Sequence, residues 1–169
     1  MLKSLIPSYV FKKYTDITPR FLLEIGVDFL MLDLDNTLAK YSEHEPSPDC
    51  IEWVTTMNEN GITLYLVSNS KRETRVDSFA AALNLPFVKN ARKPSPSRLF
   101  EAMALFEKDK HTSAFLGDQI FTDTHAANRA SVCSILVRPL SLKNPLLFLR
   151  YIAEIPFRLI YALMNYKER

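Results

Sequence analysis

Apolar runs alternate with amphipathic stretches between residues 27 and 137, and this alternation limits the fold more than any other feature of the sequence. The runs 27–34 and 62–67 are almost continuously apolar, as expected for strands that are covered on both faces. Strands that alternate with helices predict right-handed crossovers and an α/β fold with a doubly wound parallel sheet. The expected strands are 27–34, 62–67, 87–88, 113–116 and 132–137, and the expected helices are 20–25, 46–60, 72–84, 97–106 and 123–130.

The composition places the chain among ordinary globular proteins. Its 169 residues suffice for one domain, and 47% of them are hydrophobic while 24% are charged, which excludes disorder and coiled coils. The two cysteines, Cys50 and Cys133, provide neither a disulfide framework nor a zinc site, and residues 1–13 do not resemble a signal peptide. A cytoplasmic location is therefore expected. The net charge of +2 gives no reason to expect nucleic acid as a partner.

Charge is unevenly distributed along the chain. Residues 26–137 carry 11 basic and 15 acidic side chains, residues 1–25 carry 4 and 2, and residues 138–169 carry 6 and 2. The two basic ends fit an anionic partner surface, and they fit solvated tails about equally well. We expect one domain over residues 1–137, with a helical extension at 1–26, followed by an apolar and basic helical segment at 138–169.

Polar residues follow the expected strands at the points where these strands end. In doubly wound sheets, ligands bind just beyond the carboxyl ends of the strands. The residues at these ends are therefore the candidates for a functional site. They are Asp33, Asp35, Asn36 and Thr37 after the first strand, Ser68 and Asn69 after the second, Lys93 after the third, and Asp118 and Asp123 after the fourth.

The carboxylates Asp33, Asp35 and Asp118 among these candidates favour metal binding and phosphoryl transfer. Asp33 and Asp35 would share one face of a regular strand, and Asp118 follows a different strand. Converging acids repel one another unless a hard divalent cation such as Mg²⁺ lies between them. A carboxylate beside Mg²⁺ can attack phosphorus, and a second carboxyl can protonate the leaving group and later deprotonate water. Ser68 and Lys93 supply a hydroxyl and a cation for the phosphoryl oxygens.

The strand-end residues resemble the motifs of the haloacid dehalogenase (HAD) phosphatases, in the same order and at similar spacing. This resemblance implies a HAD-like, Rossmannoid sheet. It is closest to the small YqeG-like branch of subfamily IIIA, which is similar to the mitochondrial phosphatidylglycerophosphatases. The runs that carry it are D-I-T-P at 16–19, G-V-D-x-L-x-x-D-L-D-N-T-L at 26–38, Ser68, Lys93-Pro94, and G-D-Q-x-x-T-D at 117–123.

The resemblance implies catalytic roles for three residues. Asp33 would be the nucleophile and a metal ligand. Asp35 would be the general acid and base, with its backbone carbonyl on the metal. Lys93 would neutralise the phosphoryl group and orient Asp33.

It also implies binding roles for four more. Thr37 and Ser68 would contact the phosphoryl group. Asn69, judged from its position after Ser68 and not from the resemblance, would either contact that group or shape the loop. Asp118 would be a direct metal ligand, and Asp123 would support the metal's waters or simply begin its helix. The implied cofactor is Mg²⁺.

The sequence leaves no room for a cap domain. Thirty residues separate Thr37 from Ser68, and 24 separate Ser68 from Lys93, and both gaps are occupied by expected helices and strands. An uncapped cleft favours large substrates whose own bulk excludes water, such as phospholipid head groups or phosphoproteins.

The segment 146–164 is apolar at 15 of its 19 positions. Its charges, Arg150, Glu154 and Arg158, recur every fourth residue and form one stripe on a helix. Three such charges cost roughly 9 kcal/mol in a bilayer against roughly 5 kcal/mol recovered, so the segment is not expected to span a membrane. Two interpretations remain. One is a helix at the membrane interface, and the other is a helix pair that covers a sheet edge or contacts a second copy.

The sequence allows two interpretations of two arginines near the motifs. Arg72 and Arg75 lie one helical turn apart just after Ser68. They would either contact an anionic substrate or form a solvated face, and the solvated face is favoured.

These expectations converge on a Mg²⁺-dependent phosphomonoesterase with an aspartyl-phosphate intermediate. The resemblance suggests phosphatidylglycerophosphate as its substrate, at the cytosolic face of a membrane. The alternatives are a phosphatase for a phosphoprotein or soluble monoester, and a regulatory or assembly module with a vestigial site. The geometric requirement is that the carboxyls of Asp33 and Asp118 lie within ~4–5 Å of each other.

Overall fold

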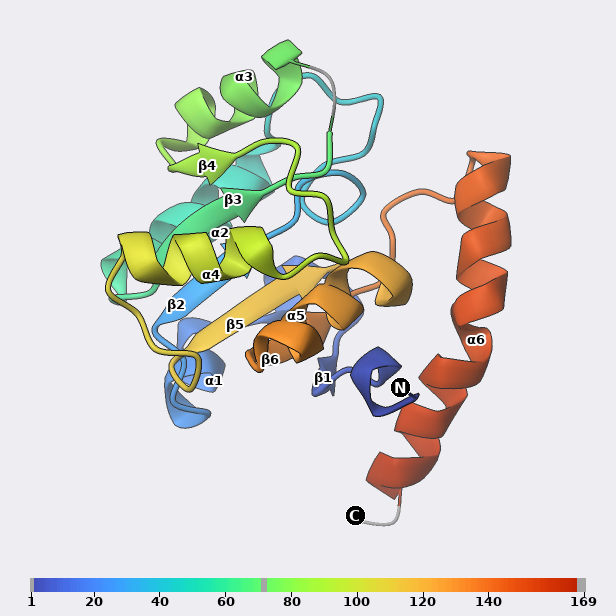
Figure 1. The fold of residues 1–169 in the computed structure, drawn as a ribbon. Coiled ribbons are helices and arrows are strands. Elements are labelled where there is room, and N and C mark those ends of the chain that lie inside the picture. Colours follow the sequence, from blue (N-terminus) through green and yellow to red (C-terminus); the bar gives the residue numbers. More distant parts are fainter. Residues whose placement is uncertain (1, 71–72, 167–169) are drawn as a thin grey trace.

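The computed structural model describes residues 2–70 and 73–166, and it shows a six-stranded parallel sheet with helices on both faces (Figure 1). The strand order is β1-β6-β5-β2-β3-β4, which confirms the expected doubly wound α/β fold. The strands are β1 (Tyr9–Val10), β2 (Phe29–Leu32), β3 (Thr63–Val67), β4 (Phe87–Val88), β5 (Ser113–Gly117) and β6 (Cys133–Leu136). The helices are α1 (Pro19–Glu24), α2 (Pro48–Glu59), α3 (Glu73–Leu83), α4 (Ser97–Leu105), α5 (His125–Ala130) and α6 (Pro145–Tyr166).

The apolar run around β2 is continuous because both faces of the sheet are buried. Leu30 and Leu32 pack with α1, α2 and α3 on one face, whereas Phe29 and Met31 pack with α4 and α5 on the other. All four side chains are fully buried. Burial of such side chains stabilises the fold by about 1.5–3 kcal/mol each.

Capping residues set the starts of the first two α-helices. Thr18 accepts a hydrogen bond from the backbone N–H of Phe21, and Pro19 is the first residue of α1. Ser47 accepts one from the backbone N–H of Cys50 at the start of α2. Both caps satisfy N–H groups that have no partner within the helix. The predicted helix at 46–60 is therefore two residues shorter at its start, because Ser47 is outside it.

The sequence predicts a helical N-terminal extension, but the structure shows that this extension also contains a strand. It adds β1 to the edge of the sheet, where Tyr9 pairs with Ile135 of β6. The hydroxyls of Ser8 and Ser134 also lie within hydrogen-bonding distance, at 3.3 Å. A strand of two residues has too short a pattern to show the alternation on which strand prediction depends.

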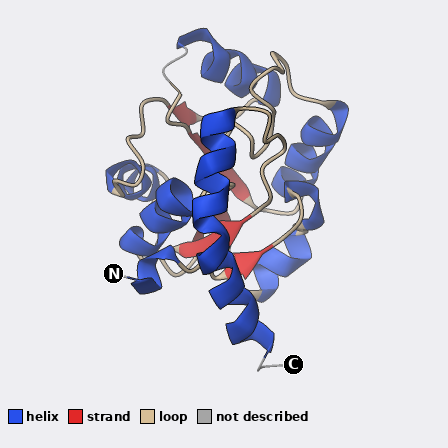
Figure 2. Cartoon of the chain, turned by 90° about the vertical axis from the view of Figure 1, so that its right-hand side faces the viewer, coloured by secondary structure: helices blue, strands red, loops and turns tan. Residues whose placement is uncertain are grey.

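The C-terminal segment is one continuous helix rather than a helix pair. In Figure 1 α6 stands at the side to which β5 points, and Figure 2 shows it crossing that side of the molecule. The strands are parallel, so their carboxyl ends all lie on this side. Among the described residues, no helix has the length and apolar character needed to cross a membrane.

Candidate active site

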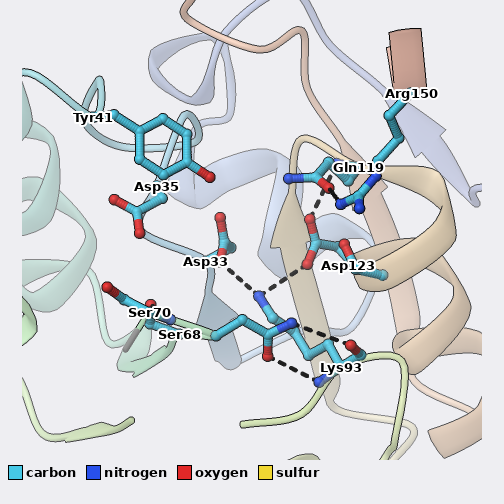
Figure 3. Close-up of a pocket in the computed structure, with 11 residues that line it drawn as sticks. Asp33, Asp35, Tyr41, Ser68, Ser70, Lys93, Gln119, Asp123 and Arg150 are labelled. Carbon is cyan, nitrogen blue, oxygen red and sulfur yellow. Dashed lines mark hydrogen bonds and ion pairs between the residues drawn. The ribbon is translucent and has the colours of Figure 1, made fainter. Parts of the chain in front are cut away.

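A pocket of about 350 Å³ opens at the carboxyl ends of the central strands (Figure 3). It is formed where the chain leaves β2, β3 and β5 and by the loop after β4, as the position of the motifs predicts. In the part of the chain that the structure describes, no cap domain is inserted between Thr37 and Ser68 or between Ser68 and Lys93. The pocket is lined by Asp33, Asp35, Tyr41, Ser68, Asn69, Ser70, Lys93, Gln119, Thr122, Asp123 and Arg150.

Three buried carboxylates converge beside this pocket. Asp33, Asp118 and Asp123 each offer an oxygen, and these oxygens all lie within 4.8 Å of one another. The distance required of Asp33 and Asp118 is therefore met. The Lys93 ammonium lies 2.6 Å from Oδ1 of Asp33 and 2.9 Å from Oδ1 of Asp123. One ammonium cannot balance three carboxylates, so the cluster has an excess of negative charge.

The pKa values of these groups reflect that excess. Burial, opposed by Lys93 and assisted by the Asp123 charge, raises the pKa of Asp33 to about 7. Burial and the neighbouring carboxylates also raise the pKa of Asp118 well above its usual range. Burial alone would lower the pKa of Lys93, but Asp123 and Asp33 raise it, so this side chain stays charged. Oxygen ligands with a surplus of negative charge fit a hard divalent cation.

The spacing of the last motif has a steric reason. A Cβ at Gly117 would lie 2.4 Å from the Cβ of Asp123. This distance is too short for two carbon atoms that are not bonded, so residue 117 has to be glycine. Asp123 also accepts a hydrogen bond from the backbone N–H of Gln119 at 3.0 Å. The turn therefore folds Asp123 back over Gly117 and into the cluster. Asp123 therefore joins the cluster, and its role as a direct metal ligand or as support for the metal's waters stays a prediction.

Asp35 does not share the cluster with Asp33, contrary to the expectation from strand alternation. β2 ends at Leu32, so the alternation of faces does not extend to these residues. Asn36 follows with a left-handed φ of 67°. The Asp35 carboxylate lines the pocket apart from the cluster and is paired with Nε of Arg75 at 2.8 Å.

Arg75 is buried, and the favoured interpretation of it as a solvated residue is wrong. Besides Asp35, its guanidinium donates to the backbone carbonyls of Lys40, at 2.8 Å, and Glu43. A planar guanidinium can serve several acceptors at once. It therefore fixes both the Asp35 side chain and the loop that carries Tyr41. Arg72, its neighbour in the prediction, lies outside the described residues.

The three predicted phosphate-binding residues are placed differently from one another. Ser68 lines the pocket, and its Oγ accepts the backbone N–H of Ser70 at 3.0 Å. The Asn69 side chain exchanges two hydrogen bonds with the backbone of Lys93 and so shapes that loop. The Thr37 hydroxyl donates to Oδ2 of Asp33 at 3.0 Å, so it orients a carboxylate. Direct contact of these groups with phosphate stays a prediction.

The charged stripe of α6 faces the loop between Asp118 and Asp123, which the sequence did not reveal. Oε1 of Glu154 accepts the backbone N–H groups of Ile120 and Phe121, at 2.8 and 3.2 Å. Arg158 donates to the backbone carbonyl of Asp118 at 3.0 Å. The i, i+4 spacing showed that these charges share a face, but not that the face points inward.

A buried carboxylate beside an ammonium group, in a carboxylate cluster that could hold a divalent cation, is suited to the hydrolysis of phosphoryl groups. The chain belongs to the haloacid dehalogenase-like hydrolase family, whose model matches residues 10–131. It is 34% identical over 161 residues to the probable phosphatase YqeG of Bacillus subtilis, covering 95% of this chain and 92% of that one. The chain is therefore a YqeG-like phosphatase, and a vestigial regulatory module is not supported.

Two solved structures are similar in fold. An uncharacterized protein from Listeria monocytogenes has a TM-score of 0.55 at 15% identity, over 70% of this chain and 85% of that one. The cobalt-bound deoxy-D-mannose-octulosonate 8-phosphate phosphatase of Haemophilus influenzae has a TM-score of 0.52 at 13% identity, over 68% and 80%. At these identities the likeness shows the fold alone.

We predict that Mg²⁺ stabilises the protein more at pH 8 than at pH 5.5. A carboxyl whose pKa rises from 3.8 to about 7 on folding contributes stability below about pH 4, and that stability is lost as the pH rises through 7. The metal-free protein thus weakens over this range, while the ionised ligands bind the cation. Thermal unfolding with and without Mg²⁺ measures the difference, and Asp118→Asn should abolish it. An equal shift at both pH values would contradict the account.

We also predict that Arg75→Met lowers kcat by about 100-fold, because Asp35 loses the contact that positions it. The Mg²⁺-induced thermal shift should be retained, since Arg75 pairs with the Asp35 carboxylate, which lies outside the carboxylate cluster, and not with the Asp35 backbone carbonyl. Steady-state kinetics with p-nitrophenyl phosphate measure the first effect. Arg98→Met is the matched control, because Arg98 pairs with Glu101 on the surface of α4. Unchanged kcat in Arg75→Met would show that the ion pair has no part in catalysis.

Proposed function

We propose that this phosphatase works through an aspartyl-phosphate on Asp33. The observation that supports this most is the environment of that carboxylate, which borders the pocket with Lys93 on one oxygen and Thr37 on the other. These two contacts fix its orientation, as in-line attack on phosphorus requires. Attack by a carboxylate oxygen breaks the bond from phosphorus to the leaving oxygen, and the phosphoryl group passes to Asp33.

Asp35 is the proposed general acid and base. In the first step it delivers a proton to the departing alkoxide, and in the second it removes one from the water that hydrolyses the intermediate. Water attack releases inorganic phosphate and restores the Asp33 carboxylate. Arg75 holds Asp35 at the wall of the pocket throughout.

Mg²⁺ is the proposed cofactor. Asp33, Asp118 and Asp123 would hold it, together with the backbone carbonyl of Asp35. Mg²⁺ supplies positive charge that neutralises the phosphoryl oxygens. Lys93 adds a fixed cation from this chain, and Ser68 adds a hydroxyl at the pocket wall.

The proposed substrate is phosphatidylglycerophosphate, which the enzyme would convert to phosphatidylglycerol and phosphate at the cytosolic face of a membrane. The motifs resemble the YqeG-like branch, and the similarity of that branch to the mitochondrial phosphatidylglycerophosphatases supports this choice. So do the uncapped pocket and the Arg150 guanidinium at its wall. A lipid held in a bilayer supplies the bulk that excludes water from an open cleft.

Asp33→Asn should reduce turnover of p-nitrophenyl phosphate to background, because an amide cannot attack phosphorus. The fold should persist, since an amide fills the same space. Circular dichroism checks the fold, and phosphate release checks the activity. Asp77→Asn is a matched control, because Asp77 pairs with Lys89 outside the pocket. Activity retained in Asp33→Asn would remove the proposed nucleophile.

A panel of phosphomonoesters tests the substrate separately. Phosphate release should show the highest kcat/KM for phosphatidylglycerophosphate in detergent micelles, above phosphatidic acid, a sugar phosphate and a phosphoserine peptide. Micelles present the head group without requiring a bilayer. A clear preference for the soluble sugar phosphate or the phosphopeptide would overturn the lipid substrate and leave the chemistry intact.

A further inference from the structure

The outer face of α6 is apolar and exposed along most of the helix. Leu146, Leu149 and Leu163 are 77%, 64% and 67% exposed. Within residues 2–70 and 73–166, no element covers this face. Its members are Leu146, Phe148, Leu149, Ile152, Ala153, Ile155, Pro156, Leu159, Ile160, Ala162, Leu163 and Met164, which we call the α6 outer face.

An ordinary surface helix buries its apolar side and exposes its polar side. In α6 the apolar side is exposed and the charged stripe faces the protein. Its polar stripe is used inside the protein, where Glu154 is only 1% exposed and Arg158 reaches the carbonyl of Asp118. These contacts fix which way the helix faces. The α6 outer face runs from Leu146 to Met164, which is about 28 Å of helix. An exposed apolar strip of that length on a protein surface marks an interaction site.

The N-terminal segment and the segment that contains α6 are basic. Residues 2–13 contain no acidic side chain, and in residues 138–164 the acidic side chain is the buried Glu154. Residues 11–13 and 137–144 follow β1 and β6, whose carboxyl ends lie on the side where α6 stands (Figures 1 and 2), whereas residues 2–8 precede β1. Their exposed basic residues are Lys3, Lys12, Lys13, Arg138, Lys143 and Arg150.

An exposed apolar helix face, together with exposed basic residues on the segment that leads into the helix, matches an anionic bilayer. Apolar side chains enter the boundary between head groups and acyl chains, and lysines and arginines contact the anionic head groups. A second copy of this chain matches less well, because a two-fold contact would bring the same basic residues together. The charge around the helix therefore favours a lipid surface over a dimer.

We propose that α6 is an interfacial helix that docks the protein on an anionic lipid bilayer with the mouth of the active site toward the head groups. Arg150 links the two features, since it lines the pocket and belongs to the exposed basic residues beside the α6 outer face. Its guanidinium is held by Oε1 of Gln119 at 2.6 Å. The inference rests on the proposed function for the identity of the substrate, whereas the docking itself is measured without substrate.

Vesicle flotation of the full chain tests the docking. The wild type should float with vesicles of phosphatidylglycerol and phosphatidylcholine, less so at high salt, and much less with phosphatidylcholine alone. The double substitution Leu159→Glu and Leu163→Glu should weaken binding by about 100-fold. Its activity on p-nitrophenyl phosphate should be unchanged, because neither residue lines the pocket. Leu105→Glu on α4 is the matched control, since Leu105 is as exposed as Leu163, at 67%.

Three results would overturn the proposal. The first is a wild type that does not float with anionic vesicles. The second is equal loss of binding in Leu105→Glu, which would show that any added charge disrupts it. The third is a wild-type dimer in sedimentation equilibrium that the double substitution dissociates, in the absence of vesicle binding, which would assign the face to a second copy. If the wild type floats with anionic vesicles but prefers a soluble phosphomonoester over phosphatidylglycerophosphate, the lipid substrate is rejected and the docking of α6 is retained.

Discussion

The structure depends on bringing three carboxylates and one ammonium group together in a buried place. Asp33, Asp118 and Asp123 are all buried, and so is Lys93. Buried charges are costly unless they are paired. Lys93 pairs with two of the carboxylates, and a divalent cation is the partner that balances the remainder. The parallel sheet provides the geometry, because it ends its strands at one edge and brings residues distant in sequence to the same point.

A second group of buried charges holds the loops around that cluster. Arg75 ties Asp35 to the backbone near Tyr41, and Glu154 accepts two N–H groups from the loop between Asp118 and Asp123. Neither residue belongs to a motif, and neither lies in the carboxylate cluster. Each is a long charged side chain that reaches a loop from a helix. The precision of the site therefore rests partly on α3 and α6, as well as on the strands that carry the catalytic residues.

Most of the fold and the composition of the site were predictable from the sequence, for two physical reasons. Continuous apolar runs indicate strands buried on both faces, and the polar residues after them must lie at one edge of a parallel sheet. The predictions that failed concern features that depend on tertiary contacts. The early end of β2 turned Asp35 toward Arg75, and the edge strand at Tyr9 is too short to show a pattern. The stripe of α6 was recognised, but its direction was not, because spacing defines a face without saying what covers it.

The central claim is that the buried carboxylates share one cation opposite Lys93. The most direct measurement is a crystal structure of the protein with Mg²⁺ and a phosphate analogue. The account predicts one ion with oxygens of Asp33, Asp118 and Asp123 at about 2.1 Å, and the analogue between that ion and the Lys93 ammonium. An ion bound elsewhere, or an analogue out of reach of the Asp33 carboxylate, would contradict it.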